Sequence, residues 1–382
     1  MFIKRIHPDT LSRAIENIGS EKQGQKIMNK KGEVIIFEIK NLPLSAMMIL
    51  KQEALSVGGD LATPKDGILA KKSHYDGVLI ATKSQLERIV SKCKIQPFGL
   101  KELADQVASH LKIAPQSLDF PQIMAIVNIT PDSFFSGSRC DGKRAIERIY
   151  QLMEKGVGFI DIGAASSKPG SDLIDFREEK QRLNDVANEI YTQNLFKKAL
   201  FSIDTYNPQT ADFALAKGFG VVNDISGYHH SDMAKITAQY NATAVLMHSK
   251  GTPKVMQKLT DYADLFGEID NFFEQKIQWL QSFGIKNIIL DIGFGFAKNQ
   301  EQNLALIKHL KHFLHFGRPI LVGASRKNTI GLLTQRDTQD RLAGTLALHF
   351  FALQNGANIL RVHDEDEHLD ILKIYEALEA VK

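Results

Sequence analysis

Short apolar runs alternate with longer amphipathic stretches from residue 123 to the end of the chain. Runs of this length are typical of strands that are buried on both faces, as in a parallel sheet. The first is Ile123–Val127, which switches abruptly to polar residues at Asn128. The runs predict eight strands, which end near Asn128, Asp161, Asp204, Asn223, Met247, Asp291, Gly323 and Arg361.

A helical stretch follows each predicted strand. The first has the spacing of an amphipathic helix, with Ile146, Ile149, Tyr150 and Met153 on one face. The eight stretches cover about 141–156, 174–194, 208–217, 231–240, 261–284, 300–315, 338–355 and 366–380. Eight strand–helix units over about 260 residues predict an α/β fold of the (β/α)8 TIM-barrel type. An open doubly wound sheet is the alternative, but the chain lacks its Gly-rich dinucleotide fingerprint.

Residues 1–115 follow a different pattern. Two strands are predicted at 33–39 and 77–81, with helices at 44–55, 84–93 and 100–111. Thr82 or Ser84 is the expected cap of the second helix. We therefore predict a small α+β domain of unassigned role over residues 1–115. A catalytic barrel follows over residues 116–382, and the two prolines of 112–122 mark the linker.

Composition narrows the class of protein. The 382 residues are 43% hydrophobic and 24% charged, as in ordinary globular chains. A net charge of +3 implies no nucleic-acid partner. Two cysteines exclude a disulfide scaffold and suit a reducing compartment. We find neither the apolar core of a signal peptide nor a membrane-length apolar run, so we expect a cytoplasmic protein with no membrane partner.

The predicted strand ends carry the candidate chemistry, because a barrel gathers those ends at one rim. After the first strand, Asn128 and Asp132 lie in a Pro-stiffened segment that suits a phosphate or a metal–phosphate complex. The alternative for Asp132 is a helix cap. After the second strand, Ser167, Lys168 and Pro169 form a loop that is either a lid over the mouth or a plain surface loop.

Three strands end in groups that suit a flat heterocycle. Asp204 offers an acceptor, and Asn223 offers both a donor and an acceptor. Asp291 is followed by glycines interleaved with Phe294 and Phe296, which permit close backbone approach and supply aromatic faces. The alternatives are a helix cap at Asp204, a turn amide at Asn223 and a core carboxylate at Asp291.

The last strand ends carry cations. Lys327, which follows Gly323 by four positions, is either a donor to a heterocycle or a Schiff-base lysine. Arg361 and His363 share one side of the chain if Val362 points outward, and together they suit a diphosphate. Met247 is expected to line the lumen, whereas the neighbouring His248 is more typical of a core or loop histidine.

Eight motifs in this order resemble dihydropteroate synthase over residues 123–382. They are NITPDSF, DIG…PGS, SIDT, NDISG, LMH, LDIGFGF, GASRK and RVHD. The resemblance implies an enzyme that joins 6-hydroxymethyl-7,8-dihydropterin diphosphate to 4-aminobenzoate and releases diphosphate. It also implies a homodimer formed through barrel helices.

The resemblance implies roles for individual residues. Asn128 would bind a Mg²⁺ cofactor that carries the diphosphate. The catalytic residues would be Asp132, Asp204, Asp291 and Lys327. The substrate-binding residues would be Asn128, Ser167, Lys168, Pro169, Asp204, Asn223, Met247, Asp291, Phe294, Phe296, Gly323, Lys327, Asn328, Arg361 and His363.

The chain departs from the family pattern mainly at residues 163–170. This segment reads GAASSKPG where the family resembles GGESTRPG, so Lys168 keeps a charge but loses the bidentate fork of arginine. The altered loop leaves a non-catalytic pterin-binding paralogue as an alternative. A pterin-dependent methyltransferase barrel and a Lys327 aldolase are two others, although a methyl transfer has no diphosphate for NITPDSF to hold.

Overall fold

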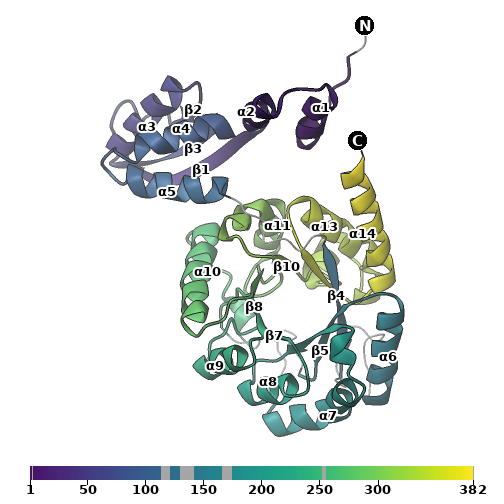
Figure 1. The fold of residues 1–382 in the computed structure, drawn as a ribbon. Helices are drawn as coiled ribbons and strands as arrows, with labels where there is room; N and C mark the ends of the chain where they lie inside the picture. The colour runs from purple at the N-terminus through teal and green to yellow at the C-terminus, as the bar shows by residue number, and fades with distance from the viewer. Residues whose placement is uncertain (2, 113–120, 130–141, 166–173, 252–254, 382) are drawn as a thin grey trace. The chain divides into compact units, whose positions relative to one another are not determined.

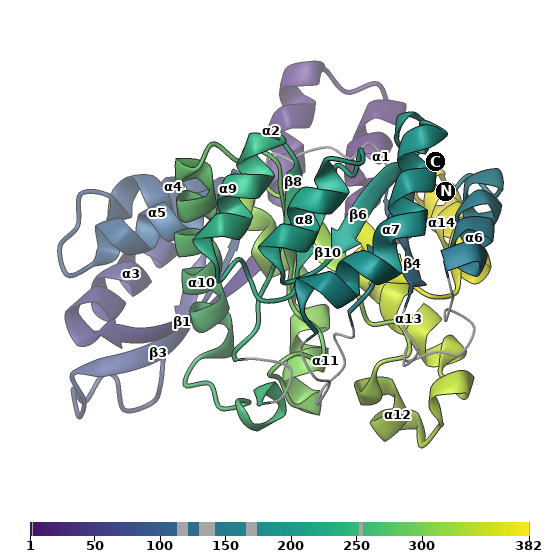
Figure 2. The same cartoon turned by 90° about the horizontal axis from the view of Figure 1, so that it is seen from below.

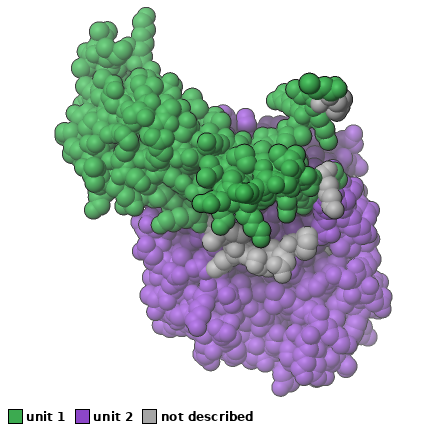
Figure 3. All heavy atoms as spheres, turned by 45° about the horizontal axis from the view of Figure 1, so that its top comes forward, with its two compact units in different colours: residues 1–114, 381–382 green, residues 115–380 purple. Residues whose placement is uncertain are grey.

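The computed structural model describes residues 1, 3–112, 121–129, 142–165, 174–251 and 255–381 (Figure 1). The chain divides into two compact units, Met1–Ala114 with Val381–Lys382 and Pro115–Ala380, which Figure 3 distinguishes by colour. The predicted boundary after residue 115 falls within 113–120, outside the described residues. In the described part of the chain, every helix is too short or too polar to cross a membrane.

The first unit is an α+β module built on a three-stranded antiparallel sheet of order β1-β3-β2. Thr82 ends β3 and caps α4, where Gln85 N donates to Thr82 Oγ1 and Thr82 N donates to Gln85 Oε1 at 2.7 Å. The sequence missed α1, α2 and β2. The unit contains η1 (Pro8–Thr10), α1 (Leu11–Asn17), α2 (Lys22–Gly32), β1 (Val34–Pro43), α3 (Leu44–Ser56), β2 (Asp60–Ala62), β3 (His74–Thr82), α4 (Lys83–Cys93) and α5 (Leu100–Leu111).

The second unit is a closed barrel of eight parallel strands, in the order β10-β11-β4-β5-β6-β7-β8-β9 (Figures 1 and 2). The predicted (β/α)8 TIM barrel preceded by a small α+β N-terminal region is confirmed. Each strand ends within two residues of the predicted position. The strands are β4 (Gln122–Asn128), β5 (Phe159–Gly163), β6 (Leu200–Asp204), β7 (Val221–Asp224), β8 (Thr243–Met247), β9 (Ile288–Asp291), β10 (Ile320–Val322) and β11 (Ile359–Val362).

Helices surround the barrel and fit the predicted stretches, with two differences. The stretch 300–315 is a helix that tightens into the 3-10 helix η5, and 338–355 begins as the 3-10 helix η6. The sequence also missed α12, a seven-residue helix after β10. The helices are α6 (Gly142–Glu154), α7 (Phe176–Thr192), η3 (Leu195–Lys197), α8 (Pro208–Leu215), α9 (Ser231–Gln239), η4 (Met256–Lys258), α10 (Leu265–Ser282), α11 (Gln300–Lys308), η5 (Leu310–Phe316), α12 (Asn328–Thr334), η6 (Thr338–Asp340), α13 (Leu342–Gln354) and α14 (Glu365–Ala380).

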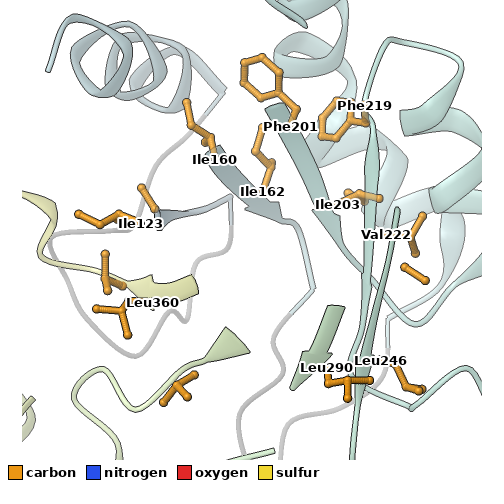
Figure 4. Packing of buried hydrophobic residues seen from close by; sticks show 14 of the residues in the cluster. Ile123, Ile160, Ile162, Phe201, Ile203, Phe219, Val222, Leu246, Leu290 and Leu360 are labelled. Atoms are coloured by element: carbon orange, nitrogen blue, oxygen red, sulfur yellow. The ribbon is translucent and has the colours of Figure 1, made fainter. Parts of the chain in front are cut away.

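Two apolar layers hold the barrel together. The outer layer lies between strands and helices and includes Ile162, Phe201 and Ile203 (Figure 4). The inner layer fills the lumen and consists of Met124, Phe159, Val221, Val245, Ile289, Leu321 and Ile359. Because side chains alternate along a strand, the residues two positions after each inner-layer residue also face the lumen. The inner layer is thus the floor beneath the polar strand ends.

Candidate active site

The polar layer above this floor gathers side chains from strands that are far apart in sequence. Alternation places Asp161, Asn223, Met247, Asp291 and Arg361 two residues beyond the inner apolar layer. Asp204 pairs in register with both Gly163 and Asn223, and Met247 pairs with Asp291. The predicted convergence of strand-end groups at one mouth therefore follows from the register of the barrel.

Arg361 bridges two carboxylates on one side of the mouth, which we call the acidic side. Its Nε donates to Asp161 Oδ2 and its Nη2 to Asp204 Oδ2, each at 2.6 Å. Asn223 Nδ2 also donates to Asp161 Oδ2, at 3.1 Å. Asp161 was absent from the predicted site residues. Its lumen-facing position, two residues after Phe159 and two before Gly163, is the signal that identifies it.

The acidic side holds more negative charge than Arg361 balances. Burial raises the pKa of Asp204 to about 7; nearby Asp161 adds to this, while Arg361 opposes it. Asp161 Oδ1 is buried and has no hydrogen-bond partner among the described residues. Behind the strand, buried Glu179 accepts hydrogen bonds from Thr205 Oγ1 at 2.8 Å and Thr210 Oγ1 at 2.5 Å, which fixes the turn after Asp204.

The opposite side, which we call the lysine side, contains the carboxylate of Asp291 and two cations. Asp291 Oδ1 accepts from Gly293 N at 2.7 Å, and burial raises the pKa of Asp291. Lys327 Nζ donates to the carbonyl of Phe294 and lies 4.5 Å from the ring centroid of Phe296. Burial lowers the pKa of Lys327 to about 8, against the attraction of Asp291.

Lys298 is the second cation of the lysine side, and the sequence missed it. Its Nζ lies 3.0 Å from His248 Nδ1 and donates to the carbonyls of Gly293 at 3.2 Å and Phe296 at 3.0 Å. Burial lowers the pKa of Lys298 to about 7, and it also lowers the pKa of His248. A neutral His248 accepts from Lys298, so this histidine is a paired, buried residue. The signal for Lys298 was its place directly after the GFGFA run.

Arg361 and His363 share the inner side of β11, because Val362 is fully buried in the outer apolar layer. His363 Nδ1 lies 2.9 Å from Ser325 Oγ. Burial lowers the pKa of His363 to about 3, and the positive charge of Arg361 adds to this effect. His363 is therefore neutral near pH 7, and Arg361 carries the permanent positive charge of this strand.

Several predicted residues are placed less directly in the site. A Cβ added at Gly163 would lie 3.2 Å from Asn128 Oδ1 and 3.6 Å from Asp204 Oδ2, so Gly163 keeps the space between them open. Gly323 lies beside Arg361, because a Cβ added at Gly323 would lie 3.7 Å from Arg361 Cβ. Asn328 is exposed at the first position of α12.

The two phenylalanines of the GFGF run differ in exposure. Phe294 has no exposed surface and packs in the outer apolar layer, whereas Phe296 is only half-buried. Phe296 is thus the ring with exposed surface, next to Lys327 Nζ, and Phe294 contributes its carbonyl to Lys327. The predicted residues Asp132, Ser167, Lys168 and Pro169 lie outside the described residues.

Comparison with known proteins decides the family. The model described as "Pterin binding enzyme" matches residues 124–363. The chain belongs to the pterin-binding enzyme family. A "bifunctional dihydropteroate synthase/dihydropteroate reductase" of Helicobacter pylori is 56% identical over 379 residues, which cover 99% of both chains. The predicted dihydropteroate synthase is confirmed, and this pterin-binding enzyme is a transferase.

Solved structures of this family match the barrel. A Yersinia pestis dihydropteroate synthase in a sulfonamide drug complex is 34% identical, with a TM-score of 0.65, and the match covers 70% of this chain and 96% of that chain. A Thermus thermophilus dihydropteroate synthase in complex with 4-aminobenzoate is 34% identical, with a TM-score of 0.61 and coverage of 69% and 96%. The Helicobacter relative, by contrast, matches this pterin-binding enzyme over both units.

Proposed function

We propose that the groups at the barrel mouth divide the substrate of this dihydropteroate synthase between them. Asp204, Asn223, Asp291 and Lys327 hold the pterin, and Arg361 with His363 holds the diphosphate. The observation that carries the proposal is the pair of 2.6 Å ion pairs through which Arg361 joins Asp161 and Asp204. These contacts put the cation of β11 next to the carboxylate of β6, so a diphosphate on one lies beside a ring on the other.

The reaction breaks the C–O bond between the pterin methylene and the diphosphate. The electron pair leaves with the diphosphate oxygen, and Arg361 stabilises the departing charge. Positive charge that develops on the pterin is favoured by the carboxylates of Asp204 and Asp291. The neutral amine of 4-aminobenzoate then donates its lone pair to form the C–N bond and loses a proton to solvent or diphosphate. An arylamine is nucleophilic when neutral, so the reaction needs no strong general base.

We propose Mg²⁺ as the cofactor, held through Asn128. An amide oxygen is a hard ligand of the kind Mg²⁺ prefers, and the missing Cβ of Gly163 leaves room beside Asn128 Oδ1. The bound ion would neutralise part of the diphosphate charge. Asp132, which lies outside the described residues, is the predicted catalytic carboxylate close to this ion. Removal of Mg²⁺ with a chelator, followed by its restoration, tests the requirement.

Diphosphate release by the purified chain tests the reaction on which this division of the substrate rests. The assay contains the pterin diphosphate, Mg²⁺ and 4-aminobenzoate, and dihydropteroate is measured as the second product. Release that depends on all three components supports the proposal. If the chain binds the pterin but aminobenzoate does not trigger diphosphate release, the proposal is contradicted. The altered 163–170 loop would then be the favoured explanation for the lost turnover. Borohydride trapping separates the Lys327 aldolase, because only a Schiff base gives a stable adduct.

A second activity, dihydropteroate reduction, is favoured by one observation. The match to the bifunctional Helicobacter relative runs through the N-terminal unit, which the matched synthase structures do not cover. We infer that this chain also reduces the dihydropterin ring, with a hydride to the imine carbon and a proton to its nitrogen. The hydride comes from a reduced nicotinamide or flavin nucleotide. Oxidation of either nucleotide that depends on dihydropteroate tests this activity, and its absence with both nucleotides rejects it.

We propose that the enzyme acts as a homodimer in the cytoplasm, on small-molecule substrates alone. Helices α13 and α14 expose Phe351, Ile374 and Leu378, each between 44% and 56% accessible. Apolar residues on two adjoining helices suit a contact with a second copy. Light scattering on the parent and on Phe351→Asp tests the dimer, and fractionation of cells tests the compartment. A parent that is a monomer at assay concentration would reject the dimer.

A further inference from the structure

Two histidines and a carboxylate meet outside the strands of the barrel, where α10 lies against η5. One oxygen of Asp270 and one ring nitrogen each of His312 and His315 lie within 4.8 Å of one another. Asp270 comes from α10, and both histidines come from η5. None of the three belongs to the strand-end cluster, so the synthase reaction gives them no role.

The backbone of η5 brings the two histidines together. A 3-10 helix has three residues per turn, so side chains three positions apart lie on one face. His312 and His315 have this spacing, and they face α10, where His312 Nε2 lies 2.8 Å from Asp270 Oδ2. An ordinary α-helix would rotate the second histidine away by about 60°. The tightening of the chain after α11 is therefore what builds the cluster.

The hydrogen bond of His315 sets the tautomer that a metal needs from this ring. His315 Nδ1 lies 2.6 Å from the carbonyl of His312, which can only accept, so Nδ1 carries the proton. A proton on Nδ1 places the lone pair of the ring on Nε2. Histidines that bind metals commonly donate their other N–H to a carbonyl in this way.

The carboxylate is only partly satisfied by the protein. Asp270 Oδ2 is paired with His312, but Asp270 Oδ1 is buried and has no hydrogen-bond partner among the described residues. A buried carboxylate oxygen without a partner is costly, and a cation would remove that cost. A surface ion pair between Asp270 and His312 explains one carboxylate oxygen and one ring, but it leaves Asp270 Oδ1 without a partner among the described residues.

Aromatic side chains hold the two imidazoles in place. Phe266 and Phe313 contact the His312 ring edge-on, with centroid distances of 5.3 and 5.0 Å. Phe316 packs against His315 at a centroid distance of 4.0 Å. Ligands fixed in this way lose little conformational entropy when an ion binds. The cluster is thus preorganised as well as chemically suited.

We propose that Asp270, His312 and His315 bind a divalent transition-metal ion of the Zn²⁺ class. Two imidazoles and one carboxylate match the ligands that Zn²⁺ accepts, and three protein ligands leave a position for water. This donor set is softer than the oxygen donors that Mg²⁺ prefers, so the site is distinct in kind from the one at Asn128. The bound ion would join α10 to η5 and stabilise the outer layer of the barrel.

Cobalt titration of the full chain tests the site, because Co²⁺ takes zinc-type ligands and absorbs visible light. The protein is prepared without a polyhistidine tag and treated with a chelator before titration. We expect one saturable Co²⁺ equivalent that Zn²⁺ displaces. His312→Ala and His315→Ala should each weaken binding by more than about 100-fold, since loss of outer-sphere partners alone costs roughly 10–100-fold. Asp270→Asn, which keeps the shape of the side chain, should weaken binding in the same direction.

Matched controls separate this site from other histidines and from the active site. His309 is exposed, three residues before His312, and outside the cluster. His309→Ala should bind Co²⁺ as the parent does, and so should Asn128→Ala. Zn²⁺ should raise the unfolding temperature of the parent and of His309→Ala, but not of His312→Ala. A Co²⁺ signal that survives in both His312→Ala and His315→Ala, or that His309→Ala removes equally, overturns the proposal.

Discussion

The two sides of the barrel mouth have opposite arrangements of charge. The acidic side places Asp161 and Asp204 around the cation Arg361, whereas the lysine side places Lys298 and Lys327 around the carboxylate Asp291. Among these described groups, each side has one more charge of its own sign than of the opposite sign. Burial moves the pKa of Asp204 to about 7 on the acidic side, and on the lysine side it moves the pKa of Lys298 to about 7 and that of Lys327 to about 8.

The difference in charge bears on the proposed function. A surplus carboxylate next to a permanent guanidinium suits a ligand that carries both a diphosphate and N–H donors. On the lysine side, burial leaves the surplus ammonium of Lys298 about half protonated at pH 7, so it is a hydrogen-bond donor with less than a full charge. Under the proposed function, the acidic side binds the diphosphate through Arg361, and its Asp204 shares the pterin ring with Asp291 and Lys327 of the lysine side.

The largest expected effect comes from Arg361→Met. Loss of the guanidinium leaves two buried carboxylates without their cation, which should lower the free energy of unfolding by about 3 kcal/mol. Loss of the contact to the leaving group should lower kcat/KM by roughly 1000-fold. Urea unfolding and diphosphate release measure the two effects. The double variant with Asp161→Asn should regain stability without regaining activity. If both return together, Arg361 has no separate role toward the diphosphate.

Asp291→Asn removes the carboxylate that defines the lysine side. Pterin affinity and kcat should fall together, each by about 100-fold, because an amide cannot attract the pterin cation. The pKa of Lys327 should fall further, since Asp291 is the main group that raises it. Pterin fluorescence and single-turnover kinetics measure these changes.

Asp224→Asn is the matched control for Asp291→Asn. Asp224 is also buried, but its carboxylate accepts from the backbone of Ser226 at 2.8 Å and Tyr228 at 3.1 Å. This control should lose stability and keep pterin affinity. Near-normal turnover in Asp291→Asn would remove Asp291 from the mechanism.

The pH dependence of stability should have opposite slopes on the two sides. Between about pH 4 and 7, Asp204 is protonated in the native state and ionised in the unfolded chain, because its native pKa is raised. The contribution of Asp204 to the free energy of unfolding therefore falls as the pH rises. Between about pH 7 and 10, Lys298 is neutral in the native state and protonated in the unfolded chain, because its native pKa is lowered. The contribution of Lys298 to the free energy of unfolding therefore rises with the pH.

Two substitutions isolate these slopes. Asp204→Asn should remove the fall in the free energy of unfolding below about pH 7, and Lys298→Met should remove the rise above it. Each change should be on the order of 1 kcal/mol per pH unit. Urea unfolding at several pH values measures both, with the exposed Lys286→Met as the control. Equal slopes in the parent and in both variants would contradict the assignment of surplus charge.

The smallest expected effect distinguishes the two phenylalanines of the lysine side. Phe296→Leu removes a half-buried ring 4.5 Å from Lys327 Nζ, so the KM for 4-aminobenzoate should rise by about tenfold or less. Phe294→Leu removes a fully buried ring and should lower stability by about 1 kcal/mol with little change in this KM. Steady-state kinetics and urea unfolding separate the two outcomes. The opposite pattern would make Phe294 the ring that meets the substrate.

The strands of the barrel and its family were predictable because each is a local pattern. Runs such as Ile123–Val127 indicate buried strands, and motifs such as LDIGFGF match the family pattern in the same order along the chain. The short elements were harder. Helix α12 has seven residues with a glycine inside, and β2 has only three, so neither offers enough periodicity to recognise. Tertiary contacts hold these segments in place.

The sequence alone determined which side chains end the strands, because strand length and the alternation of side-chain direction depend on residues that are neighbours in the chain. Only the tertiary structure decided how those side chains pair, since Arg361 reaches Asp161 across 200 positions and Asp204 across 157. The same holds for Lys298 against His248, and for Asp270 against η5. Charge balance, burial and ligand geometry depend on distances that the closed barrel sets, and local sequence patterns carry no information about such distances.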